Sequence, residues 1–267
     1  MPPTLGGVTR TSSPPASPGR QRRGPGWVPN QHGAWAMLAS PLLVGVLAGR
    51  LAWVQLPLAA FWFVGYFAFF AASLWLKAGR RAKWLPPVRV YAAMSAVLGL
   101  LVLVMQPGLA RWIPAFLVPL AVGLYAAAHR RDRALLAGLA TTAGSALMTV
   151  VAYDAGPGTD LRRAWVLALV QLLYFAGTVF YVKTVIRERD NPVFRWLSIG
   201  YHAAALVAVA VVYGLVEHEG PVWPLLLVFA LLLVRAIVVP PYRPTPKQAG
   251  IGEIVATVAV AVTSLLA

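Results

Sequence analysis

Two polar side chains without an evident structural role stand at the start of the first long apolar segment. The stretch PNQHGAWAML, residues 29–38, places Gln31 and His32 directly before that segment and Trp35 just inside it. Asn30 is suited to cap the amides of a following helix, so its presence needs no ligand. An amide and an imidazole beside it can both donate and accept hydrogen bonds. We interpret Gln31 and His32 as ligand-binding residues.

A second group of polar side chains interrupts an apolar stretch further along the chain. Gln171, Tyr174, Thr178 and Tyr181 follow one another in steps of three, four and three residues. On a helix this spacing places all four on one face. The stripe predicts either hydrogen bonding between the helices of a bundle or the wall of a ligand pocket. On the second interpretation, Tyr174, Thr178 and Tyr181 bind the ligand.

Three cations and another histidine are expected near the same end of these segments. Lys183 and Arg187 follow the stripe four residues apart, and Arg133 precedes an earlier apolar segment. Such side chains either extend to lipid headgroups or bind an anionic group such as a phosphate. His202 lies early in a later segment. We add these four residues to the predicted ligand-binding set.

A haem or metal site between His32 and His202 is a separate alternative. No His-x3-His or HExxH spacing supports it, and unrelated histidines at the membrane surface are the simpler interpretation. The chain has no cysteine, which excludes disulfides, thiolate metal sites and cysteine nucleophiles. We therefore predict no metal ligand and assign no cofactor.

The composition is typical of a protein embedded in a lipid bilayer. Hydrophobic residues make up 59% of the 267 residues, charged residues only 12%, and the mean hydropathy is +0.71. A soluble domain carries about twice that share of charge. We predict an all-α polytopic bundle of about nine spans. Their approximate limits are 33–50, 56–76, 88–106, 112–128, 134–153, 164–184, 196–216, 221–239 and 251–267.

The positive charges predict how the bundle is oriented. With the N-terminus in the cytoplasm, all but four of the 23 Lys and Arg residues fall in the N-terminal tail or in and beside the loops after every second span. This bias is typical of the cytoplasmic side, and it places the C-terminus outside. It also explains the net charge of +15 without nucleic acid as a partner. We predict a multi-pass protein of the inner membrane, with the lipid bilayer as its partner.

The sequence divides into a tail and one membrane domain. Residues 1–26 are rich in Pro, Gly, Ser and Arg and contain no apolar stretch of the kind found in a signal peptide. We predict a disordered, basic cytoplasmic tail there and a transmembrane helical domain over 27–267.

Two further patterns concern the interior of the bundle. No Asp, Glu, Lys or Arg is expected deep in any span, which argues against ion-coupled transport. Gly138, Thr142, Ser145 and Thr149 are spaced by four, three and four residues. Small residues at this spacing predict close packing against a neighbouring helix.

Two longer stretches carry a family resemblance. PNQHGAWAMLASPLLVG and GTVFYVKTVIRERDNPVFRWLSIGYH, together with the shorter RDRALLAG, resemble the YwiC-like family of bacterial integral membrane proteins. The resemblance covers most of the chain from Trp27 onward. It implies a helical membrane domain and supplies no mechanism.

The nine-span layout is also similar to that of the UbiA-type prenyltransferases, whose active site lies on the cytoplasmic loops after the second and sixth helices. Those enzymes hold magnesium with two aspartate-rich motifs, because the leaving diphosphate develops charge. Here the first loop, SLWLKAGRRAKWLPP, has no acid, and the second has only Glu188 and Asp190. The similarity therefore implies at most a modified site.

These patterns together predict a multi-pass membrane protein that binds an amphipathic ligand at its cytoplasmic face. The ligand classes are a phosphorylated or other lipid, an isoprenoid and a quinone. The alternatives are a UbiA-like prenyltransferase that lacks the aspartate-rich motifs, and a membrane transporter. The patterns favour no particular reaction.

Overall fold

The computed structural model describes residues 26–29, 32–216 and 218–267, with the side chain of His32 left out. The tail and Gln31, for which predictions were made, lie outside the described residues. Within the described ranges the chain forms nine α-helices and no strand. They are α1 His32–Gly49, α2 Gln55–Lys77, α3 Leu85–Met105, α4 Ile113–Ala128, α5 Leu135–Asp154, α6 Leu161–Ile186, α7 Pro192–Leu215, α8 Trp223–Val238 and α9 Pro246–Leu266.

Each predicted apolar segment corresponds to one of these helices, which confirms the predicted all-α bundle. In the described part of the chain, seven helices are long and apolar enough to cross a membrane, whereas α1 and α8 are apolar but shorter. Helices satisfy their own backbone hydrogen bonds, so they suit the hydrocarbon interior of a bilayer. The helical apolar bundle is that of a membrane protein.

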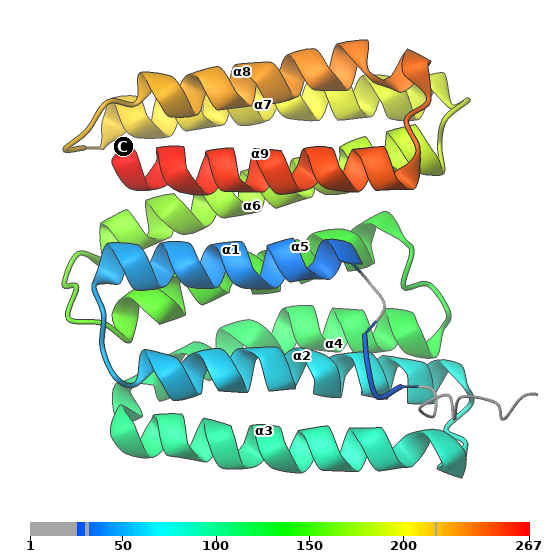
Figure 1. Cartoon of the computed structure of the whole chain (residues 1–267), viewed down its shortest axis with the longest axis vertical. Coiled ribbons are helices and arrows are strands. Elements are labelled where there is room, and N and C mark those ends of the chain that lie inside the picture. The colour runs from blue at the N-terminus through cyan, green and yellow to red at the C-terminus, as the bar shows by residue number, and fades with distance from the viewer. Residues whose placement is uncertain (1–25, 30–31, 217) are drawn as a thin grey trace, which may run out of the picture.

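The helices lie side by side, with α1, α5 and α6 at the centre (Figure 1). On one side are α2, α3 and α4, and on the other α7, α8 and α9. Helix α3 packs mainly on α2 at the edge of the molecule and exposes most of its apolar surface. Helices α5 and α6 are the most buried of the seven long helices. The centre of the bundle is therefore where polar side chains need partners.

Small residues let α1 and α5 pack closely. A Cβ atom on Gly45 would overlap the carbonyl oxygen of Thr149, and one on Gly49 would overlap the backbone of Tyr153. The hydroxyl of Ser145 donates a hydrogen bond to the carbonyl oxygen of Met37 in α1. The predicted close packing of the small residues in α5 is thereby confirmed.

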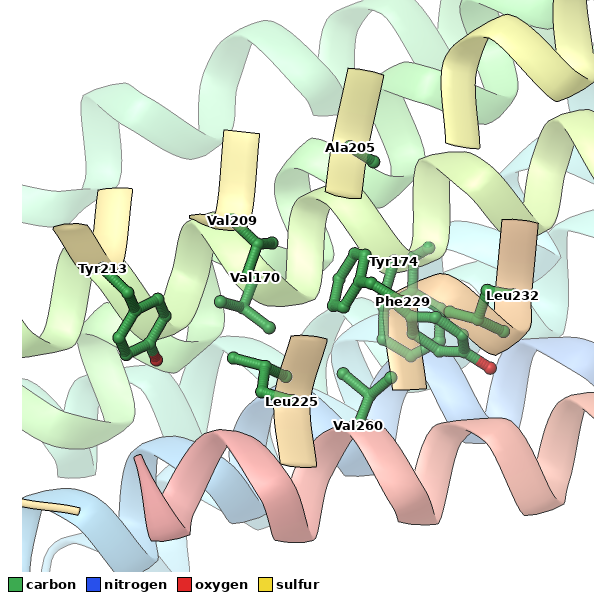
Figure 2. Packing of buried hydrophobic residues seen from close by; sticks show 10 residues of the cluster. Val170, Tyr174, Ala205, Val209, Tyr213, Leu225, Phe229, Leu232 and Val260 are labelled. Atoms are coloured by element: carbon green, nitrogen blue, oxygen red, sulfur yellow. The ribbon is translucent and has the colours of Figure 1, made fainter. Parts of the chain in front are cut away.

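The other half of the bundle has its own hydrophobic core between α6, α7, α8 and α9 (Figure 2). Val170 of α6, Leu225 of α8 and Val260 of α9 converge there, and each is almost fully buried. This core surrounds Tyr174, whose ring lies in the same cluster. The hydroxyl of Tyr174 must therefore find a partner inside the bundle.

The loops after α2, α4, α6 and α8 lie together at one end of the molecule, at the right in Figure 1. We call this the basic end, defined by residues 77–84, 129–134, 183–191 and 239–245, which include the last turn of α6. Lys77 there pairs with Asp132, Nζ to Oδ2, at 2.7 Å. Partial burial alone would raise the pKa of Asp132, but the hydrogen bond and charge of Lys77 and the charge of Arg133 lower it below its usual range.

Candidate polar site in the helix bundle

An ion pair between α8 and α9 is buried inside the bundle. Nη1 of Arg235 lies 2.8 Å from Oε1 of Glu253, an ion contact rather than a well-aligned hydrogen bond. The two side chains are only 17% and 11% exposed. The prediction that no charged residue lies deep in a span is wrong, because Glu253 sits about two turns inside α9. The predicted span began at residue 251, so residues 246–250 were not predicted to be helical and Glu253 was expected at the membrane surface.

A capping box explains why α9 begins at Pro246, before the predicted start at residue 251. The Thr245 hydroxyl accepts a hydrogen bond from the Gln248 backbone N–H at 3.3 Å, and the Gln248 side chain accepts one from the Thr245 N–H at 2.9 Å. Pro246 occupies the first helical position, where its missing N–H has no consequence. The polar turns from 246 to 253 are therefore helical.

Hydroxyl groups surround the carboxylate of Glu253. Thr178 donates a hydrogen bond to Oε2 at 2.7 Å, and the Tyr174 hydroxyl lies 3.1 Å from the same oxygen. The Tyr174 hydroxyl is also 2.9 Å from that of Thr257, one turn further along α9. Tyr174 lies near the middle of α6. This network brings the carboxylate towards the middle of the bundle.

Arg235 is held on its other side by an aromatic ring and leaves donors unused. Its guanidinium carbon lies 4.0 Å from the centroid of the Tyr181 ring, a cation–π contact. Its Nε and Nη2 atoms are buried and have no hydrogen-bond partner among the described residues. Buried N–H groups of a charged side chain that lack an acceptor are costly.

His202 of α7 lines the same region next to α6. Its Nδ1 lies 2.7 Å from the carbonyl oxygen of Ser198. A Cβ on Gly177, one residue from Thr178, would stand 3.1 Å from Nε2 of His202. The Ser198 hydroxyl is buried without a partner in the described residues. Gly177 thus leaves the imidazole room beside the stripe of α6.

The lower part of the α6 stripe joins α1 instead. The Ser40 hydroxyl donates to Oε1 of Gln171 at 2.9 Å, while Nε2 of Gln171 is buried and has no partner within the described chain. All four stripe residues therefore face the interior. Three of them, Gln171, Tyr174 and Thr178, bond side chains of other helices, which confirms the interpretation of interhelical hydrogen bonding.

The structure brings together only part of the predicted ligand-binding set. Tyr174, Thr178 and Tyr181 meet at the Arg235–Glu253 pair, with His202 beside them. The other described members lie at the basic end: Lys183 Nζ is 5.7 Å from the ring centroid of Phe194, and Arg133 and Arg187 are exposed. Gln31 and the side chain of His32 fall outside the described residues, so their predicted role stays a prediction.

Sequence reasoning missed the two charged residues at the centre of the site. Arg235 was placed at the cytoplasmic end of its span, and Glu253 at the cytoplasmic start of the last predicted span, 251–267. One signal was present, because Glu253 and Thr257 are four residues apart and share a helix face. Pairing across helices is not visible in the spacing of either segment. In the described residues, no three His, Asp or Glu side chains lie close enough to hold a metal ion.

Three arginines tie the loops of the basic end across this half of the bundle. Arg189 donates from Nη2 to the carbonyl oxygen of Pro244 at 2.9 Å, and Arg195 to that of Ile237 at 3.1 Å. Arg243 pairs with Asp190 at 2.7 Å. The α6–α7 loop is thus joined to the α8–α9 loop, and the first turn of α7 is joined to the end of α8.

The sequence is similar to one known protein family and to proteins of two bacteria. The YwiC-like protein family matches residues 28–153. The chain is 34% identical to the uncharacterized protein YwiC of Bacillus subtilis (strain 168) over 179 residues, which is 66% of this chain and 73% of that protein. It is 27% identical to an uncharacterized protein of Haemophilus influenzae over 231 residues, 86% of this chain and 93% of that one. No solved structure matches it.

Proposed function

The chain belongs to the YwiC-like family, and on that premise we propose that it is a multi-pass inner-membrane protein that binds an anionic amphipathic ligand among α6, α7, α8 and α9. Arg235 holds the oxyanion of the headgroup, and the apolar chain lies against the hydrophobic surface of the bundle. Tyr174, Thr178, Tyr181, Glu253 and His202 shape the site. Arg133, Lys183 and Arg187, with Gln31 and His32, form the cytoplasmic rim through which the headgroup enters.

The observation that carries this proposal is the pair of unpartnered donors on Arg235. Nε and Nη2 of one guanidinium form the fork that binds two oxygens of a phosphate or carboxylate. A quinone offers one carbonyl oxygen at a time and matches this fork less well. Among the ligand classes considered, a lipid or isoprenoid with a phosphate or carboxylate headgroup therefore fits best.

Native mass spectrometry of the protein in mild detergent tests this assignment. We expect the wild-type protein to retain a lipid with an acidic headgroup, and Arg235→Gln to retain at least about tenfold less. Arg243→Gln removes an exposed arginine from the basic end and serves as the matched control. Equal retention by the Arg235→Gln and wild-type proteins contradicts the proposal. If the protein instead retains a quinone, the ligand is a quinone and not a lipid with an acidic headgroup.

Removing Arg235 alone leaves Glu253 without its partner, which can unfold the protein. The double variant Arg235→Gln/Glu253→Gln removes both charges and avoids a lone buried carboxylate. It is expected to remain folded and to lose the lipid. An excess of inorganic phosphate distinguishes a free anion from a lipid, because only a site for free anions is emptied by phosphate alone.

A transporter is the second candidate, and the buried charges favour it. Ionisable residues inside membrane helices commonly line pathways for ions or substrates. Flipping of fluorescently labelled phosphatidylglycerol in proteoliposomes tests it. A flipping rate above that of protein-free vesicles, and lowered by the double variant, supports transport. Equal flipping rates with and without the protein contradict transport and leave lipid binding as the proposed function.

A further inference from the structure

We propose that Glu253 takes up one proton when a monoanionic headgroup binds to Arg235, so that the two are bound together. This inference rests on the proposed function and adds a second bound species to it. In that step the carboxylate of Glu253 becomes a carboxylic acid, the proton comes from solvent, and no other bond is formed or broken. The site would then bind an acid rather than an anion.

The first argument is charge balance inside the bundle. Arg235 and Glu253 form a pair with no net charge, and both side chains are more than four-fifths buried. An anionic headgroup on Nε and Nη2 of Arg235 would place a second negative group on the same guanidinium. In a poorly solvated interior, one cation offsets only one anion. Protonation of Glu253 restores neutrality while the headgroup is bound.

The second argument is that the surroundings of Glu253 suit both its charged and its neutral form. Apart from Arg235, the partners of its carboxylate among the described residues are the hydroxyls of Thr178 and Tyr174. A hydroxyl can rotate to donate to a carboxylate or to accept from a carboxylic acid. Backbone N–H groups or a second cation could not accept a hydrogen bond from the carboxylic acid in this way. The network therefore accommodates the protonated acid without repacking.

The ionisable groups around Glu253 come from α6, α7, α8 and α9 itself. They are Tyr174 and Tyr181 of α6, His202 of α7 and Arg235 of α8, while α9 itself carries Lys247 near its start and residues 33–49 of α1 contribute none. Of these, His202 is the other group that could take up a proton near neutral pH. An experiment must separate Glu253 from His202.

Binding of phosphatidylglycerol to the full-length protein in phosphatidylcholine nanodiscs provides that separation, since this lipid stays a monoanion between about pH 5 and pH 8. We expect the wild-type affinity to fall by up to about tenfold for each unit of rising pH, as one coupled proton requires. Calorimetry in two buffers of different ionisation enthalpy is expected to give close to one proton per lipid.

Two variants decide which residue carries the proton. Glu253→Gln mimics the neutral acid, so its affinity is expected to be independent of pH and to match or exceed that of the wild type at high pH. His202→Asn is expected to keep the pH slope. A slope that persists in Glu253→Gln, or that disappears in His202→Asn, overturns the assignment to Glu253. Equal affinity at every pH in the wild type overturns proton coupling but leaves the proposed function standing.

The failure of the proposed function gives a different result. If phosphatidylglycerol does not bind the wild-type protein at any pH, and Arg235→Gln behaves in the same way, the headgroup site itself is contradicted, and the coupled proton with it. Glu219→Gln removes an exposed carboxylate at the opposite end from the basic end and serves as the control for general effects of charge. It is expected to keep the wild-type slope.

Discussion

The role of Glu253 is indicated by the residues around it in the fold rather than by its position in the sequence. In the sequence it stands beside Gly250 and Gly252 at the cytoplasmic start of the last predicted span. In the folded chain it faces Arg235, Thr178 and Tyr174, and a buried acid with such partners is typical of a functional site in a membrane protein. The contacts between helices therefore change the interpretation of Glu253 from a residue at the membrane surface to a buried member of the polar site.

Gly45 provides a test of how tightly α1 and α5 pack. We expect Gly45→Ala to destabilise the protein by about 1 to 3 kcal/mol, because the added Cβ overlaps the backbone of Thr149 and the helices must separate. Gly33→Ala, in the same helix, has nothing within 4 Å of its added Cβ and is expected to be neutral or slightly stabilising. Thermal unfolding in detergent measures both. Equal stability of the two variants contradicts the close packing.

The helices differ in how their ends are specified. Local signals set three of them: Asp160 accepts hydrogen bonds from the N–H groups of Arg162 and Arg163, Asn191 from that of Phe194, and the Thr245 capping box begins α9. Such caps satisfy amides that have no partner inside the helix. In α9 the cap also starts the helix about two turns before Glu253, so it helps to place the carboxylate of Glu253 in the polar site.

Thr245→Ala tests that link. We expect it to lower the free energy of unfolding by about 1 kcal/mol through loss of the cap, and to weaken lipid retention because the first turns of α9 hold Glu253. Thr263→Ala is the matched control, since among the described residues that hydroxyl bonds carbonyl oxygens of its own helix alone. Native mass spectrometry alongside thermal unfolding reports both effects. Full lipid retention in a destabilised Thr245→Ala protein would show that the cap stabilises α9 but is not needed for lipid binding.

The whole molecule has two ends of different charge. Loops rich in Lys and Arg gather at the basic end, while the opposite end holds a closed cluster in which Arg111 and Trp112 contact the carboxylate of Asp154 at 2.5 and 2.7 Å. The structure places the loops at common ends. The predicted orientation relative to the cytoplasm follows from the bias of positive charge and remains a prediction.

The absence of cysteine makes this orientation directly testable, because each introduced cysteine is the only one in the chain. We expect Trp53→Cys and Glu219→Cys to react with a membrane-impermeant maleimide in intact spheroplasts. Arg81→Cys and Arg131→Cys, at the basic end, are expected to react only after permeabilisation. All four positions are exposed. Labelling in the opposite pattern contradicts the predicted N-terminus in the cytoplasm.

The sequence by itself determined the number of helices, their order and the alternation of charged loops. Hydropathy and loop charge are properties of contiguous segments, so the bilayer acts on each of them separately. The stripe of α6 and the small residues of α5 were readable for the same reason, since helical periodicity assigns a face to each residue.

Only the tertiary structure decided which faces meet. The contact of α8 with α9 brings Arg235 to Glu253, and that of α6 with α9 adds Tyr174 and Thr178. Lipid tails are as apolar as most side chains, so hydrophobicity does not select the partner of a membrane helix. Close packing and interhelical hydrogen bonds do. Both depend on pairs of residues far apart in the chain, and for that reason the charged pair emerged only in the folded protein.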